Sequence, residues 1–144
     1  MRVVGLGQRY GGDDGVGLRV ADAVREALPG LEVVTLTGAE GLVELLDGRP
    51  VLVVDAVLGV GPPGTLHELR PDELARVRAF STHGIGVAEA LGLAEALGGP
   101  DVLQGLTVLG IAIRPPGALA EGLSPEVAAA VPRALEHVRR WASL

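Results

Sequence analysis

The run PVLVVDAV at 50–57 is almost continuously apolar, and it restricts this chain to a small group of folds. A short run of aliphatic and β-branched residues is typical of a strand that is buried on both faces of its sheet. Such a strand needs a covering layer on each side, and helices form these layers in α/β proteins. The run is much shorter than the roughly 20 apolar residues of a membrane-spanning helix. It therefore predicts a central strand in a layered α/β fold.

Strand-like and helix-like segments alternate along the chain. Strands are expected at 2–6, 31–36, 50–57, 65–69 and 106–113, and helices at 16–28, 39–46, 85–97 and from 124 onward. This alternation predicts a three-layer α/β/α sandwich with a largely parallel sheet, and residues 1–144 as a single domain. Pro132 lies inside the last expected helix and should kink or divide it, because proline removes one backbone hydrogen bond.

Composition excludes several classes of function. The net charge is −6 and no lysine occurs, so the basic face of a nucleic-acid-binding protein is not expected. Cysteine is absent, which excludes disulfides, thiolate nucleophiles and cysteine-type zinc sites. The first residues follow a strand pattern and not that of a signal peptide. We therefore expect a cytoplasmic protein that binds neither nucleic acid nor membrane.

Two adjacent aspartates follow the first expected strand. The segment VVGLGQRYGGDDGVG at 3–17 runs from that strand through a glycine-rich loop to Asp13 and Asp14, where a helix begins. Aspartate is favoured at helix starts because it caps backbone N–H groups and interacts with the helix dipole. Asp13 is expected to be the N-cap. Capping needs only one carboxylate, so the second invites another role, such as that of a metal ligand.

Two further polar residues could reach the same crevice. Asp55 interrupts the apolar run at 50–57, and a buried carboxylate needs a partner or a ligand. His83 lies among small residues ahead of an expected helix. In a doubly wound sheet the strands before Asp14 and Asp55 can be neighbours at the switch point, where sites open. Two carboxylates and one imidazole suit a divalent transition metal.

The glycine-rich loop also has a competing interpretation as a dinucleotide site. The fingerprint of that site is G-x-G-x-x-G, whereas this loop has G-x-G-x-x-x-G over 5–11. Two aspartates at the helix start would repel a pyrophosphate, and the second strand ends in TLTG at 35–38, without the acidic residue that holds a ribose. A nucleotide-binding domain therefore stays a minor alternative.

Taken together, the motifs resemble those of the hydrogenase maturation proteases. They are GLGQRYGGDDGVG at 5–17, VVDAV at 53–57, PGT at 63–65, STHGIGVAEAL at 81–91 and LSPEVAAAVPRALEHV at 123–138. The resemblance implies a mixed, mostly parallel five-stranded sheet of the phosphorylase/hydrolase-like kind, with the fourth strand antiparallel. It implies that Asp14, Asp55 and His83 contact the metal, and it leaves Asp13 as the helix cap. The chain departs from the family at Gln8, where asparagine is usual.

The resemblance also implies an activity. Members of this family are endopeptidases that remove a C-terminal extension from the nickel-loaded large subunit of nickel–iron hydrogenases. It implies that the nickel belongs to this precursor protein, while the isolated protease could hold another divalent metal. Asp14, Asp55 and His83 would then form both the catalytic and the metal-contacting set of an aspartyl-type endopeptidase. Water activation by a carboxylate and by the metal both remain open, as does a non-proteolytic nickel-binding accessory protein of the same fold.

Overall fold

The computed structural model describes residues 1–9, 11–58, 61–74, 80–81, 86–114 and 122–143. The strands are β1 (Arg2–Leu6), β2 (Glu32–Leu36), β3 (Val51–Leu58), β4 (Leu66–Leu69), β5 (Phe80–Ser81) and β6 (Leu106–Ile113). The α-helices are α1 (Val16–Ala27), α2 (Pro71–Leu74), α3 (Val87–Gly98) and α4 (Pro125–Ala142). Three 3₁₀ turns complete the described elements: η1 (Gly12–Gly15), η2 (Ala39–Leu42) and η3 (Pro100–Leu103).

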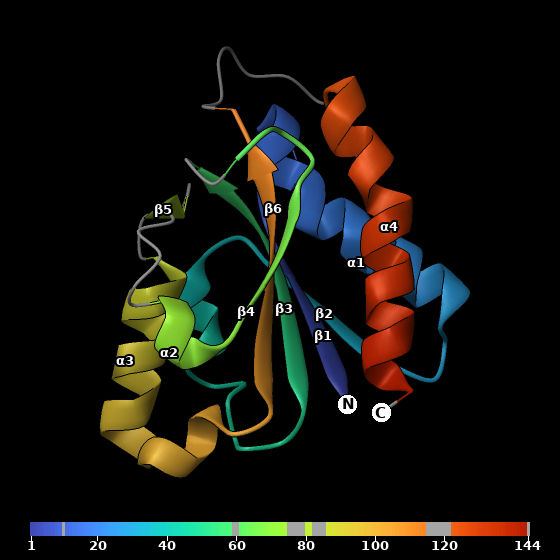
Figure 1. Ribbon diagram of the computed structural model, residues 1–144. Coiled ribbons are helices and arrows are strands. Elements are labelled where there is room, and N and C mark those ends of the chain that lie inside the picture. The colour runs from blue at the N-terminus through green and yellow to red at the C-terminus, as the bar shows by residue number, and fades with distance from the viewer. Residues whose placement is uncertain (10, 59–60, 75–79, 82–85, 115–121, 144) are drawn as a thin grey trace.

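The strands form one mixed sheet in the order β2-β1-β3-β6-β4 (Figure 1). The neighbours β2, β1, β3 and β6 pair in parallel, and β4 runs antiparallel to β6. The expected mostly parallel sheet with an antiparallel fourth strand is therefore confirmed. The two-residue strand β5, which the sequence did not predict, pairs antiparallel with the last residues of β3.

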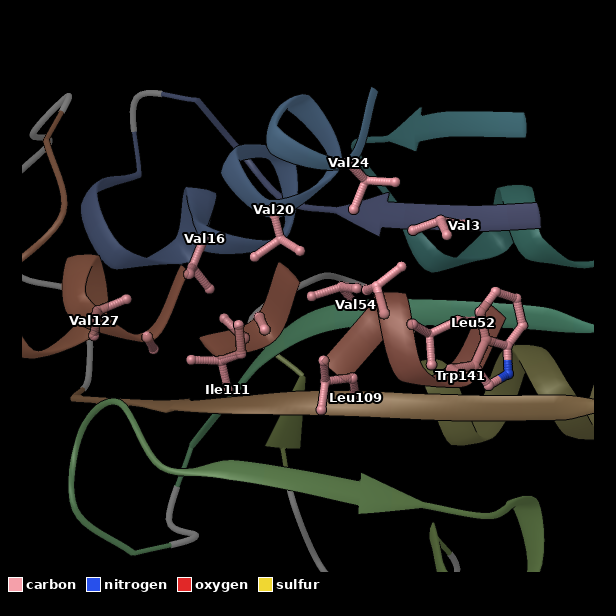
Figure 2. Packing of buried hydrophobic residues seen from close by; sticks show 14 of the residues in the cluster. Val3, Val16, Val20, Val24, Leu52, Val54, Leu109, Ile111, Val127 and Trp141 are labelled. Carbon is pink, nitrogen blue, oxygen red and sulfur yellow. The ribbon is translucent and has the colours of Figure 1, made fainter. Parts of the chain in front are cut away.

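Helices cover both faces of this sheet, as the apolar run of β3 requires. On one face, called the α1–α4 face, residues of α1 and α4 pack on Leu52 and Val54 of β3 (Figures 1 and 2). On the other, called the α3 face, residues of α3 and η2 pack on Val51 and Val53. Successive side chains of β3 thus pack on opposite faces of the sheet, as expected for an extended strand, in which side chains alternate with a period of two residues.

Helix α4 differs from the expectation in one respect. It runs from Pro125 to Ala142 without interruption, so Pro132 does not divide it. The proline is exposed, and it costs the helix one backbone hydrogen bond. The buried side of α4, which ends at Trp141 in the core, packs along the sheet on both sides of this position (Figure 2). Tertiary packing therefore outweighs the local preference of the proline.

One segment is shorter than expected: the helix expected at 39–46 is a 3₁₀ turn over Ala39–Leu42. The helical turn α2, which follows β4, was not expected from the sequence. In the described part of the chain, the helices lack either the length or the apolar character needed to cross a membrane.

Candidate functional site

Strands β1 and β3 are adjacent and parallel, so their carboxyl ends lie at the same edge of the sheet. Gly5 of β1 stands opposite Val54 of β3, one residue before Asp55. The strand that follows β1 in the sequence, β2, lies on one side of the β1–β3 pair, and the strand that follows β3, β4, lies on the other side. The connections that leave the ends of β1 and β3 therefore run to opposite sides of the sheet. This is the switch point at which open α/β sheets form their crevices. The neighbouring strands expected from the sequence are confirmed.

Glycines allow α1 to begin directly on the ends of these strands. A Cβ atom on Gly17 would lie 2.6 Å from the carbonyl oxygen of Val54 and still closer to that of Leu6. A Cβ atom on Gly5 would lie 2.5 Å from the carbonyl oxygen of Gly17 and 2.7 Å from the Cβ of Ala21. Real Cβ atoms do not approach other atoms so closely. The glycine pattern therefore serves close helix–strand packing.

Asp14 lies in the 3₁₀ turn η1 between the glycine-rich loop and α1. The residue is only 7% exposed, and η1 contacts β3. The turn is closed by the Asp14 N–H, which donates to the carbonyl oxygen of Gly11 at 3.2 Å, and by the Gln8 N–H, which donates to the carbonyl oxygen of Asp14 at 3.4 Å. A Cβ atom on Gly11 would lie 2.9 Å from the Asp14 Cβ and 3.3 Å from its Oδ2. Gly11 therefore leaves room for the Asp14 carboxylate.

Asp55 is the more deeply buried of the two carboxylates, at 1% exposure. It lies within β3, which continues to Leu58, and it stands opposite Gly110 of β6. Because Val51 and Val53 pack on the α3 face, strand alternation places the Asp55 side chain on that face as well. A buried carboxylate in an otherwise apolar central strand is costly to maintain and therefore marks a candidate site.

His83, the third predicted residue, lies outside the described residues. Described residues bracket it in the sequence: Ser81 of β5 pairs with Val57 of β3, and α3 begins at Val87. Among the residues that the structure describes, no three histidine, aspartate or glutamate side chains form a group that could hold a metal ion. The proposed three-residue metal site therefore stays a prediction.

Asp13 does not have the role expected from the sequence. Gly15, and not Asp13, occupies the N-cap position of α1, because the turn η1 is inserted before this helix. The Asp13 carboxylate instead accepts two hydrogen bonds from Ser124 at the start of α4: from its N–H to Oδ1 at 2.6 Å and from its hydroxyl to Oδ2 at 2.8 Å. Asp13 therefore lies at a helix start, as expected from the preference of aspartate for this position, but the helix is α4 and not α1.

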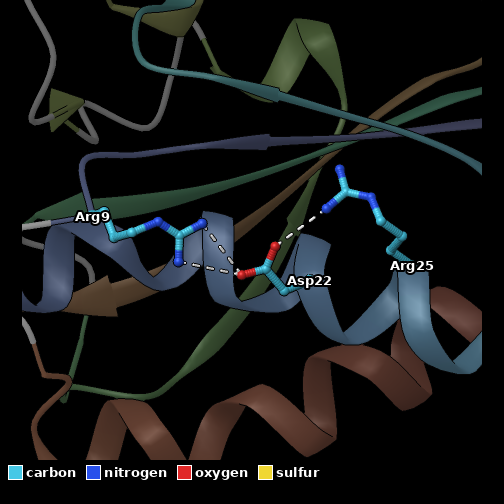
Figure 3. Close-up of polar contacts among 3 residues, drawn as sticks. All are labelled: Arg9, Asp22 and Arg25. Carbon is cyan, nitrogen blue, oxygen red and sulfur yellow. Dashed lines mark hydrogen bonds and ion pairs between the residues drawn. The ribbon is translucent and has the colours of Figure 1, made fainter.

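The glycine-rich loop is also tied to α1 at its exposed side. Both terminal nitrogens of Arg9 lie near Oδ2 of Asp22, at 3.5 and 3.4 Å (Figure 3). Oδ1 of Asp22 accepts from Arg25 at 3.3 Å. All three side chains are well exposed, so these contacts contribute little to stability, about 1 kcal/mol or less.

The described geometry thus brings two predicted carboxylates to one end of the sheet. Asp14 comes from the turn after β1, and Asp55 comes from the neighbouring strand β3. Carboxylates in such positions can ligate a divalent metal or accept a proton from water. Ser124, which the sequence marks only as a helix start, has a partner 111 residues away, and nothing in the local pattern indicates this contact.

Comparison with known families gives a consistent result. A family model described as HycI, hydrogenase maturation protease, matches residues 35–141, more than half of the chain. This match includes Asp55 and His83 but not the glycine-rich loop. Two similar proteins match most of the chain. Protein FrxA of Pyrococcus furiosus is 33% identical over 129 residues, which are 87% of this chain and 92% of that protein. A putative hydrogenase maturation protease of Methanocaldococcus jannaschii is 32% identical over 145 residues, covering 93% and 90%.

Solved structures with the same fold are similar over nearly their whole length. The [NiFe] hydrogenase maturation protease HybD from Thermococcus kodakarensis has a TM-score of 0.77 and 25% identity, with 96% of each chain covered. The hydrogenase maturating endopeptidase HybD from Escherichia coli has a TM-score of 0.76 and 28% identity, covering 95% of this chain and 88% of its own.

Proposed function

Because the chain belongs to the hydrogenase maturation protease family and is a hydrolase of peptide bonds, we propose that it removes the C-terminal extension from the nickel-loaded large-subunit precursor of a nickel–iron hydrogenase. The observation that carries this proposal is the pair of buried carboxylates, Asp14 and Asp55, at the switch point of the sheet. Burial of two carboxylates costs stability, and a role in binding or catalysis accounts for that cost.

Asp14, Asp55 and His83 are proposed to bind the nickel ion carried by the precursor. Two carboxylates and one imidazole leave coordination positions for the ligands that the precursor itself supplies. The ion is therefore part of the substrate, and its recognition would restrict cleavage to precursors that have received their metal. Gln8, whose backbone closes the turn at Asp14, places its exposed side chain beside this site, where it would contact the precursor.

Hydrolysis then requires an activated water molecule. The water oxygen bonds to the carbonyl carbon of the scissile peptide, the carbon–nitrogen bond breaks, and the leaving amine takes up a proton. An ionised Asp14 or Asp55 can accept the water proton, as expected of an aspartyl-type peptidase, or the nickel ion of the precursor can polarise the carbonyl group. An asparagine variant distinguishes the two routes. Its amide oxygen can still bind the metal, so cleavage that depends on the metal alone would persist, whereas it cannot accept a proton, so cleavage that needs a carboxylate base would be lost.

The test is processing of a purified precursor, with and without nickel, followed by mass spectrometry of the released peptide. We expect cleavage of the nickel-loaded form only, and losses on the order of 10²-fold or more for Asp14→Ala, Asp55→Ala and His83→Ala. Asp101→Ala and His137→Ala are matched controls, because both positions lie away from β1 and the start of α1 and should leave the rate unchanged.

Each failure has a distinct meaning in this assay. Normal processing by the three alanine variants would refute the site assignment. A wild-type protein that binds the nickel-loaded precursor but never cuts it would refute the proposed substrate reaction and favour the non-proteolytic accessory role.

A further inference from the structure

The hydrogen bonds between Asp13 and Ser124 join two parts of the chain that are 111 residues apart. The Asp13 carboxylate receives both donors of Ser124, the backbone N–H at 2.6 Å and the hydroxyl at 2.8 Å. Both residues are half-buried, so water competes less with these bonds than at an open surface. Hydrogen bonds to an ionised carboxylate are shorter and stronger than those between neutral groups.

Ser124 occupies the N-cap position of α4, but it does not act as an ordinary cap. Within the described part of the chain, its side chain makes no hydrogen bond to the first turn of this helix. Its hydroxyl donates instead to Asp13, whose negative charge thereby lies at the N-terminus of an 18-residue helix. The positive end of a helix dipole stabilises an anion at this place. Asp13 is therefore attached to α4 by two bonds and by the field of the helix.

This attachment acts on the turn that carries Asp14. The four-residue turn η1 is a single 3₁₀ turn, too short to be stable alone. In a 3₁₀ helix, neighbouring side chains point in directions about 120° apart, because one turn takes three residues. With Asp13 directed to α4, the side chain of Asp14 is turned elsewhere, into its buried position.

We propose that Asp13 is a positioning residue, which holds η1 against the N-terminus of α4 through Ser124 and thereby sets the orientation of Asp14. The proposal rests on the proposed function, because it takes Asp14 to be the group that meets the substrate. Asp13 itself contacts Ser124, and its contribution to cleavage passes through its neighbour.

The variants Asp13→Ala, Asp13→Asn and Ser124→Ala test this proposal in the full-length protein. Ser143→Ala is the matched control, since Ser143 lies at the opposite end of α4 and its hydroxyl donates to the carbonyl oxygen of Arg139. Two measurements are made on each protein: the kcat for the nickel-loaded precursor, and the hydrogen–deuterium exchange of the amides at 14–17.

We expect Asp13→Ala to lower kcat by about tenfold to 10²-fold, as a displaced reacting group does, with faster amide exchange over 14–17. Asp13→Asn should retain most of the rate, because its amide oxygen can accept from the Ser124 N–H and its NH₂ can donate to the hydroxyl oxygen. The kcat of Ser124→Ala should lie between those of Asp13→Ala and Asp13→Asn. The double variant Asp13→Ala/Ser124→Ala should have the same kcat as Asp13→Ala alone, because both changes break the same link.

Two results would overturn the proposal. If Asp13→Asn is as inactive as Asp13→Ala while its amides at 14–17 exchange as slowly as those of the wild type, the charge of Asp13 acts in the reaction directly. If Asp13→Ala leaves the exchange of 14–17 unchanged, Asp13 does not position the turn. The exchange measurement needs no substrate. It therefore tests the positioning role independently of the proposed function. If the wild-type protein fails to cleave the precursor, the proposed function is refuted, but the exchange measurement still shows whether Asp13 positions the turn.

Discussion

Replacement of Gly17 by alanine tests the packing on which the site depends. Gly17 is the second residue of α1, and a Cβ atom there would lie 2.6 Å from the carbonyl oxygen of Val54, where 3.4–4 Å is an ordinary contact. The carbonyl oxygen of Leu6 would be closer still. Both obstacles are backbone atoms of central strands, which cannot rotate away as a flexible side chain can. The start of α1 must therefore move off the sheet.

The expected magnitude results from two opposing terms. Forcing an extra methyl group into a packed interior costs about 1–3 kcal/mol, and a backbone obstacle places Gly17→Ala at the upper end of this range. In the opposite direction, alanine has a higher helix propensity than glycine, which raises the free energy of unfolding by up to about 1 kcal/mol. We expect the free energy of unfolding to fall by about 2 kcal/mol. Gly92→Ala in α3 is the matched control: no described atom lies within 4 Å of its added Cβ, so this variant should gain about 0.5–1 kcal/mol.

The assay is urea unfolding of both variants, followed by far-ultraviolet circular dichroism and by the fluorescence of the single tryptophan, Trp141, which is buried in the core of the α1–α4 face. Opposite signs are expected for the two glycine-to-alanine changes. The reasoning is refuted if Gly17→Ala is as stable as Gly92→Ala, because α1 would then have room for a side chain at the ends of β1 and β3.

Three other substitutions have defined outcomes. Pro132→Ala should raise the free energy of unfolding by about 2 kcal/mol in urea titrations, since it restores a helical hydrogen bond and the proline is exposed; a decrease would mean that the ring itself is needed. Asp22→Ala removes the contacts of Figure 3 and should cost less than about 1 kcal/mol, an effect that 1 M NaCl abolishes; an effect that salt leaves unchanged would contradict a screened surface contact. Gly11→Ala should lower the free energy of unfolding by about 1–3 kcal/mol and reduce precursor cleavage by about tenfold or more, because its methyl group would displace the Asp14 side chain. Gly30→Ala, with no described atom within 4 Å, should cleave normally.

The sheet could be predicted from the sequence because its strands are strongly marked. The apolar runs at 2–6 and 106–113 coincide with β1 and β6, and the run at 50–57 differs from β3 by one residue at each end. Runs of valine, leucine and isoleucine exclude most alternatives to a strand that is buried on both faces. The amino-acid sequence alone therefore marks Asp55 as a carboxylate in a buried strand.

The connections between elements were less predictable. Strand β5 has only two residues, and its pairing with β3 depends on the position of a distant segment. The role of Asp13 was misassigned because capping rules describe the nearest helix in the sequence, whereas its partner Ser124 becomes a neighbour only after the sheet and both helices have packed. Long-range hydrogen bonds of this kind leave no periodic signal in a single sequence.

The glycine-rich loop shows why its motif alone could not distinguish a protease site from a dinucleotide site. Gly5, Gly11 and Gly17 are not among the described glycines with positive φ, so their function here is to admit neighbouring atoms at short distance. Dinucleotide-binding loops use glycine for the same close approach of helix and strand. The two kinds of loop differ in how the next helix begins. A pyrophosphate binds to the free N–H groups of a helix N-terminus, whereas here η1 precedes α1 and brings the carboxylate of Asp14 to that end of the sheet. Negative charge already occupies the place where a phosphate would need positive potential, and the same charge favours a cation.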